Sequence, residues 1–371
     1  MRKLFYVPIE PLEERYTEQW YKYFPVEFSN EFDVEVIDGT PLQETIKVGT
    51  FLDINSTIAY KNSQMIKIAE LFNNGKVPQN SVFFFGDLEF WGIESLRLMA
   101  DMNNIKVNLY AYLHAASYVK GDAFQIAENY QKFTELGWVL SMDKVFVATE
   151  HHKSLFMEKR ATLANTTEYA IIADKIKVVG NPLFMDAYEA QNLPKENNIL
   201  CTNRPDKEKD VMDTLRLFES MKKDHKDWNF IFTTGRKTFK SNSPEIEQYA
   251  KKLQKEGIIQ IKSGLTKAQY HAELEKAKVV VTNNETEETF GYCVMEALIY
   301  SAAAICPDML SHPELVPQEL LYEPGNYDDC KLKIEDAMKR SSSSRYTDYS
   351  SLAVKYKSET VIQKMIDIMK G

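Results

Sequence analysis

Short apolar runs alternate with segments of helical period along almost the whole chain. Short apolar runs predict buried strands, and longer amphipathic segments predict helices. Strands that alternate with helices in this way predict βα units and a parallel sheet. In the first half, strands are expected at 4–7, 34–37, 82–85, 107–113, 145–148 and 176–179, and helices at 12–23, 58–72, 93–102, 124–136 and 153–160.

A second set of strands and helices follows the polar stretch 191–198. The chain therefore predicts an α/β protein of two doubly wound, Rossmann-like domains facing a central cleft, because such sheets bind ligands beyond the carboxyl ends of their strands. We expect one domain at 1–188, a second at 189–345 and a C-terminal helix within 346–371. The strands of the second set are expected at 199–201, 229–233, 258–261, 279–282, 303–306 and 320–322.

Composition and charge exclude several classes of protein. Of the 371 residues, 44% are hydrophobic and 27% are charged, as in an ordinary globular protein. No apolar run reaches the roughly 18 residues of a membrane helix, and the first residues lack a signal-peptide core, so we expect a cytoplasmic protein. The four cysteines form no CxxC pair, which argues against a zinc cage or a disulfide framework. The net charge of −9 lies mostly in the first half, so a broad nucleic-acid surface is not expected.

The segment at 279–298 carries the most informative chemistry. A buried strand leads into an acidic loop and then into a helix that begins near Phe290 and Gly291. A helix N-terminus offers amide groups and a positive dipole end to phosphate or sugar oxygens. Glu288 and Glu296 flank this helix start, and a carboxylate can accept two hydroxyl hydrogen bonds from a sugar ring or a ribose. Two glutamates eight residues apart are also compatible with a solvated loop before an ordinary core helix.

The stretch ETFGYCVMEA at 288–297 resembles the E-x7-E region of family 4 glycosyltransferases and their GT-B relatives. The resemblance implies that Glu288 holds the transferred sugar and that Glu296 holds the nucleotide ribose. It also implies that backbone amides near Phe290 and Gly291 face the sugar and the phosphates. Thr289 stands where the family usually has glycine, a change that narrows the pocket of the donor sugar.

Two cations after the first strand of the second set strengthen this resemblance. Arg204 and Lys209 match the spacing of the family's arginine and lysine, although Lys207 is an alternative to Lys209. Two cations at a strand end suit a leaving nucleoside diphosphate, whose charge grows as the glycosidic bond breaks. Gly264 and Leu265 occupy the place where the family's backbone contacts the nucleobase. We therefore expect a nucleotide-sugar substrate, most simply UDP-linked, with no cofactor and no metal.

The first half resembles the family by its order of elements. His114 ends a strand, as the family's catalytic-domain histidine often does, and we expect it beside the donor sugar or the reacting centre. Asp87 is expected to polarise an acceptor hydroxyl. The alternative is that Asp87 and Glu89, one residue apart at a strand end, bind Mn²⁺ or Mg²⁺ beneath a diphosphate.

The first strand is followed by PIEPLEERY where the family has a Gly-Gly pair, so this half is expected to meet its ligands differently. We expect acceptor contacts from one cation and three aromatic residues, for which packing roles are the alternative: Arg15, Tyr16, Trp20 and Trp91.

The leading hypothesis is a glycosyltransferase that retains the configuration at the anomeric carbon. Faint likeness to phage-encoded enzymes suggests a hydroxymethylated pyrimidine in DNA as the acceptor, on whose extruded base the aromatic side chains would stack. A polysaccharide or a lipid-linked sugar is nearly as well supported. An alternative of another class is a sugar-nucleotide epimerase that uses His114 and Asp87 as acid and base, and the least favoured is a non-catalytic binding module. The sequence fixes no oligomeric state.

Overall fold

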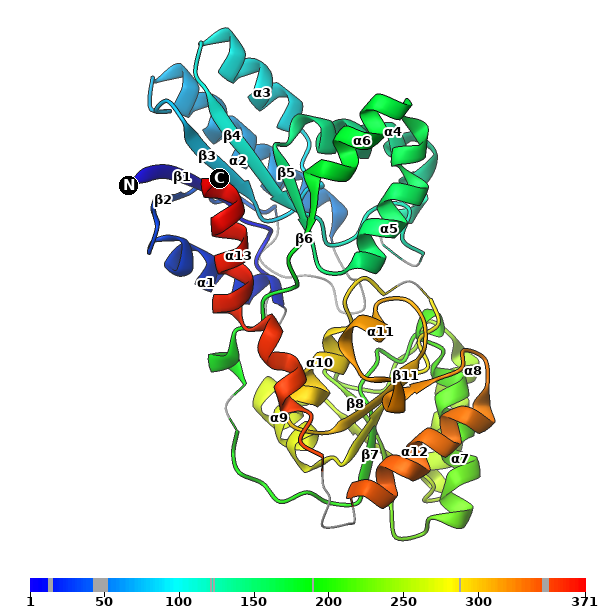
Figure 1. The fold of residues 1–371 in the computed structure, drawn as a ribbon. Helices are drawn as coiled ribbons and strands as arrows, with labels where there is room; N and C mark the ends of the chain where they lie inside the picture. The colour runs from blue at the N-terminus through cyan, green and yellow to red at the C-terminus, as the bar shows by residue number, and fades with distance from the viewer. Residues whose placement is uncertain are drawn as a thin grey trace. The chain divides into compact units, whose positions relative to one another are not determined.

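The computed structural model describes residues 1–12, 16–42, 53–120, 122, 124–188, 190–286, 288–341 and 347–371. The chain divides into two compact units, Met1–Phe184 with Ser358–Gly371, and Met185–Lys357 (Figure 1). Each unit contains one parallel sheet of six strands with helices packed on it. The predicted α/β architecture of two Rossmann-like domains is thus confirmed. Among the described residues, no helix is long and apolar enough to cross a membrane.

The sheet of the first unit has the strand order β2-β1-β3-β4-β5-β6. Every strand overlaps a run predicted from the sequence. Because β1 pairs with both β2 and β3, the direction of winding reverses between β1 and β3, and ligands of such sheets bind at that point. The bounds are β1 Arg2–Val7, β2 Phe32–Val36, β3 Ser81–Phe85, β4 Val107–Tyr112, β5 Lys144–Val147 and β6 Ile176–Val178.

One helix of the first unit, α6, was not predicted. Among its residues only Ile172 is buried, so its sequence carries no apolar stripe. The other helices coincide with or overlap predicted segments. The bounds are α1 Tyr16–Phe28, α2 Ile54–Asn73, α3 Ile93–Met102, α4 Glu128–Ser141, α5 Glu150–Lys159 and α6 Thr166–Lys175, with short 3₁₀ helices at Gln125–Ala127 and Ala161–Leu163.

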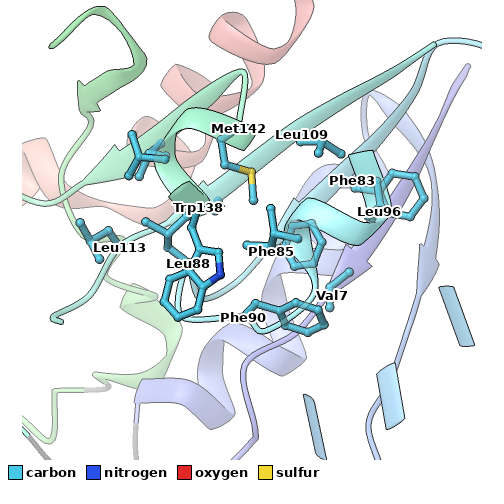
Figure 2. Packing of buried hydrophobic residues seen from close by; sticks show 14 of the residues in the cluster. Val7, Phe83, Phe85, Leu88, Phe90, Leu96, Leu109, Leu113, Trp138 and Met142 are labelled. Atoms are coloured by element: carbon cyan, nitrogen blue, oxygen red, sulfur yellow. The ribbon is translucent and has the colours of Figure 1, made fainter. Parts of the chain in front are cut away.

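The first unit has two apolar clusters that differ in kind. One contains Val7, Phe85, Leu109, Trp138 and Met142, all almost completely buried (Figure 2). The other is dominated by aromatic residues and takes in the C-terminal helix α13, Ser358–Lys370. Apolar positions recur along one face of α13 and are removed from water in this second cluster, which is why the end of the chain folds with the first unit. The buried residues of α13 in the cluster are Val361, Ile362, Met365, Ile366 and Met369.

The second unit has the strand order β12-β11-β10-β7-β8-β9, so its winding reverses between β7 and β10. A 3₁₀ helix at Ser350–Tyr356 belongs to this unit, within the segment where we expected only a C-terminal helix. The strands are β7 Asn198–Cys201, β8 Asn229–Thr234, β9 Gln260–Ser263, β10 Val279–Val281, β11 Ala303–Pro307 and β12 Leu321–Tyr322. The helices are α7 Val211–Asp224, α8 Pro244–Lys255, α9 Lys267–Lys276, α10 Tyr292–Ile299, α11 His312–Leu315 and α12 Tyr327–Ser341, with 3₁₀ helices at Met185–Ala187, Lys207–Lys209 and Gln318–Leu320.

Candidate active site

The loops that follow β7 and β10 lie side by side, because these two strands are neighbours in the sheet. The side-chain amide of Asn203, after β7, donates to Oγ1 of Thr282, after β10, at 2.8 Å. Glu285 donates its backbone N–H to Oδ2 of Asp210 at 3.1 Å, which joins the two loops a second time. The predicted donor-binding residues of these two loops, Arg204, Lys209 and Glu288, therefore stand where the winding of the sheet reverses.

Glu288 is held from three directions in this loop. Lys209 Nζ donates to its Oε2 at 3.1 Å, and Asn284 Nδ2 donates to the same oxygen at 3.3 Å. The backbone N–H of Gly291 donates to Oε1 at 3.1 Å. Burial alone would raise the pKa of Glu288, but the charges of Lys209 and His312 and the hydrogen bonds from Lys209 and Gly291 hold it below its usual range. The carboxylate is thus ionised and fixed in orientation.

Gly291 sets the start of α10. Its φ of +85° lies in the left-handed region that favours glycine, and a Cβ there would approach Leu315 Cδ1 at 3.4 Å. Phe290 is buried and its ring contacts those of Tyr292 and Tyr356, so its side chain anchors the helix start rather than facing a ligand. The backbone at this helix start remains suited to an anion.

Arg204 lies on the same edge, after β7, with 45% of its side chain exposed. Its Nη1 approaches Oδ2 of the buried Asp206 at 3.4 Å. Arg236, in the loop after β8, forms a bidentate pair with Asp206 at 3.0 and 2.8 Å. Three cationic side chains, Arg204, Lys209 and Arg236, therefore surround the carboxyl ends of β7 and β8, where a diphosphate would be neutralised.

Glu296 lies within the first two turns of α10 and is partly exposed. The hydroxyl group of Tyr270, on α9, donates a hydrogen bond to Glu296 Oε2 at 2.8 Å. Burial raises the pKa of Glu296 above its usual value, against the effect of this hydrogen bond and of Lys267. Gly264 and Leu265 precede α9, and the N–H of Gly264 donates to the carbonyl of Arg236 at 2.8 Å. The predicted ribose and nucleobase contacts thus belong to the same edge of the sheet.

In the first unit, Asp87 forms a buried ion pair that the sequence did not reveal. Lys61 Nζ lies 2.6 Å from Asp87 Oδ2, with 3% and 11% of the two side chains exposed. Lys61 also donates to the backbone carbonyl of Glu89 and lies 5.4 Å from the ring centre of Trp91. Burial, followed by the charge of Asp87, raises the pKa of Glu89 well above its usual range. The Asp87 carboxylate, which the metal alternative requires, is therefore paired with an ammonium group in this structure.

His114 follows β4 and is fixed by the strands beside it. Its Nε2 lies 2.8 Å from the carbonyl oxygen of Gly86, at the end of β3. Its ring lies against those of Trp20, Tyr112 and Tyr16, at 4.7, 4.8 and 5.3 Å between centroids. Burial lowers the pKa of His114, although Asp87 acts in the opposite direction. The imidazole is therefore held neutral near the point where the winding of the first sheet reverses.

Of the four predicted acceptor contacts, the structure describes Tyr16, Trp20 and Trp91. Trp20 is completely buried in the aromatic cluster between α1 and the sheet, so it packs and has no face for a base to stack on, contrary to our expectation. Trp91 is partly buried, with its ring beside those of Phe124 and Trp138. Tyr16 is partly exposed, and Arg15 lies outside the described residues.

Three residues with a place in these sites were missed at the sequence level: Lys61, Arg236 and Tyr270. Lys61 had a signal, because it shares the buried face of α2 with Gln64 and Ile68, where a lysine requires a partner. Arg236 and Tyr270 lie in polar segments whose partners, Asp206 and Glu296, are about 30 and 26 residues away along the chain. No local pattern connects them.

Residues 186–352, which span nearly all of the second unit, match the family model of glycosyl transferases group 1. No curated protein sequence matches the chain. Among solved structures, the fold is similar to sucrose-phosphate synthase from Thermosynechococcus elongatus, with a TM-score of 0.70, 11% identity and coverage of 100% of this chain and 98% of that one.

Two further structures have similar folds. Anabaena Alr3699/HepE in complex with UDP has a TM-score of 0.63 at 12% identity, with 100% of both chains covered. A glycosyltransferase from Rickettsia africae ESF-5 has a TM-score of 0.63 at 14% identity, covering 100% of this chain and 98% of that one. At such identities the likeness shows the fold, which is GT-B. With the family match, which covers the second unit and not the first, it indicates that the protein is a glycosyltransferase.

Proposed function

We propose that the protein is a retaining glycosyltransferase, similar to family 4, that transfers a sugar from a UDP-linked donor to a hydroxyl group without a metal ion. The observation that carries the proposal is the arrangement of Lys209, Glu288 and Gly291 at the reversal point of the second sheet. It combines a cation, an ionised carboxylate and a helix start within one hydrogen-bonded group. These are the groups that a diphosphate and a sugar ring require.

In the proposed reaction, the bond between the anomeric carbon and the diphosphate oxygen breaks as the acceptor oxygen bonds to the same face of that carbon. The acceptor's proton passes to the departing phosphate oxygen. Arg204 and Lys209 stabilise the charge that grows on the diphosphate. Glu288 orients the sugar through its hydroxyl groups, and Glu296 holds the ribose. The neutral imidazole of His114 can form one hydrogen bond with the sugar, either as donor or as acceptor.

We propose a sugar hydroxyl, on a polysaccharide or a lipid-linked sugar, as the acceptor. Stacking on an extruded base needs exposed aromatic faces, whereas Trp20 is buried and Trp91 is packed against Phe124 and Trp138. The structure of Alr3699/HepE in complex with UDP and glucose supports the choice of donor. Hydroxymethylated DNA, the acceptor of a phage-encoded enzyme, is the alternative that the assay below tests.

The experiment measures transfer of radiolabelled sugar from a panel of nucleotide sugars. Acceptors are oligosaccharides, lipid-linked sugars, and DNA of one sequence with and without hydroxymethylated pyrimidines. Label on a sugar acceptor with the α or β configuration of the donor preserved would support the proposal, and inversion would contradict the mechanism. Label on hydroxymethylated DNA alone would show that the acceptor is DNA and not a sugar hydroxyl. A changed sugar formed without any acceptor would indicate an epimerase.

A further inference from the structure

The hydrogen bond between Tyr270 and Glu296 joins two neighbouring helices of the second unit. Tyr270 lies one turn into α9, and its hydroxyl is 2.8 Å from Glu296 Oε2 on α10. Both side chains are partly exposed. Glu296 therefore has one oxygen occupied by the protein and a second that is not part of this bond.

The start of α9 fixes the position of the phenol. Gly264, with a φ of +66°, ends the preceding strand, and Thr266 caps the helix through a reciprocal capping box with Gln269. A tyrosine has only two side-chain torsions, so its hydroxyl is placed with little loss of conformational freedom. Without this bond, a partly exposed glutamate on the first turns of α10 would sample several rotamers.

We propose that Tyr270 is a positioning residue, which holds one oxygen of Glu296 so that the other oxygen faces the ribose of the nucleotide donor. The inference rests on the proposed function, since it assumes that Glu296 binds the ribose. It goes beyond that function by assigning a role to a residue outside the glutamate motif.

The charged and titratable groups around Glu296 favour a dependence on pH. Burial raises the pKa of Glu296, whereas the hydrogen bond from Tyr270 and, less strongly, the charge of Lys267 at the start of α9 lower it. The other titratable groups that interact with this carboxylate are Tyr188, Cys293 and Tyr300. Burial is the main cause that raises the pKa of each of them. Removing the Tyr270 hydroxyl takes away one stabiliser of the ionised form, so Glu296 would take up a proton at a higher pH. Ribose binding would then be lost earlier as the pH falls.

The test compares Tyr270→Phe with Tyr300→Phe, a matched control. The Tyr300 hydroxyl is buried and has no hydrogen-bond partner among the described residues. Binding of UDP and of 2′,3′-dideoxy-UDP is measured by calorimetry between pH 5 and 8. Tyr270→Phe is expected to weaken UDP binding roughly fivefold near neutral pH, as for the loss of one ordinary hydrogen bond, and more at low pH. Binding of the dideoxy compound, and of UDP to Tyr300→Phe, should stay within about twofold of the unmodified protein.

Three outcomes would overturn the inference. Equal weakening of UDP and the dideoxy compound would show that Tyr270 acts on packing and not on the ribose. The same loss in a Glu296→Gln background would show that it does not act through Glu296. Unchanged binding in Tyr270→Phe would remove its role altogether. Failure of the unmodified protein to bind UDP, GDP or ADP would instead contradict the proposed function, and the inference with it.

Discussion

Each unit carries a lysine–carboxylate pair at the point where the winding of its sheet reverses, and the two pairs differ in exposure. In the second unit, Lys209 and Glu288 lie 3.1 Å apart with 19% and 27% of their side chains exposed. In the first unit, Lys61 and Asp87 lie 2.6 Å apart with 3% and 11% exposed. The partly exposed pair can separate more easily and exchange its bonds for those of a ligand. The buried pair can do so only at the cost of leaving a charge unpaired.

This difference shows that the position of a charged pair at a strand end does not decide its role. The Lys209–Glu288 pair is anchored by the backbone N–H of a helix start and by a side-chain amide, which are groups able to donate hydrogen bonds to a ligand as well. The Lys61–Asp87 pair is anchored by a backbone carbonyl and an aromatic ring, which fix the lysine in place. The first pair is therefore suited to binding, and the second to holding α2 against the end of β3.

The largest expected effect is on the buried pair. Lys61→Met leaves Asp87 buried without its cation and is expected to lower the free energy of unfolding by about 3–5 kcal/mol. The measurement is urea unfolding followed by tryptophan fluorescence. The double variant Lys61→Met, Asp87→Leu should regain most of the loss, and Lys209→Met should cost no more than about 1 kcal/mol because its pair is partly exposed. Equal losses in Lys61→Met and Lys209→Met would abolish the distinction.

Trp20 extends the comparison of buried with partly exposed side chains from ion pairs to apolar packing. Trp20→Ala opens a cavity in the aromatic cluster of the first unit and is expected to destabilise it by about 3–5 kcal/mol. The matched control is Tyr16→Ala, whose side chain is partly exposed and should cost less. A Trp20→Ala protein of unchanged melting temperature that no longer glycosylates its acceptor would restore Trp20 as an acceptor contact.

The sequence was sufficient for the strands, for most of the helices of the first unit and for much of the second site, but not for the first site. The twelve strands of the described residues overlap predicted runs, because buried parallel strands leave an apolar signal in consecutive residues. Arg204, Lys209 and Glu288 could be singled out because they lie between a strand and a helix at spacings that resemble those of family 4 glycosyltransferases. Asp87 was singled out too, but its partner Lys61 is 26 residues away on a helix, and only packing brings them together. Trp20 was misassigned because helical period does not distinguish an aromatic that faces the sheet from one that faces a ligand.

Substitution of the partly exposed Glu288 is expected to change the rate of sugar transfer and not the free energy of unfolding. In the proposed function, Glu288→Gln removes the charge that would meet the sugar hydroxyls. A hydrogen bond to a charged group contributes about 1.5–3 kcal/mol, so transfer should slow roughly 10- to 150-fold. Binding of free UDP, which has no sugar to contact Glu288, should change little. Glu285→Gln, in the same loop but bonded to the N–H of Gly325, is the control. The role of Glu288 would be refuted if its variant lost UDP affinity as strongly as Glu296→Gln does.

The smallest expected effect is that of removing metal ions. In the proposed function, a diphosphate is neutralised at the second site by Arg204, Lys209 and Arg236, which the free protein pairs with Asp206 and Glu288. At the first site, Lys61 forms an ion pair with the Asp87 carboxylate, which would have to serve as a ligand of the metal. We therefore expect UDP to bind with nearly equal affinity in EDTA and in Mn²⁺, measured by calorimetry with Mg²⁺ as a further arm. Strict dependence on Mn²⁺ would mean that Asp87 releases Lys61 and binds metal with Glu89, and the buried pair would then be the exchangeable one of the two.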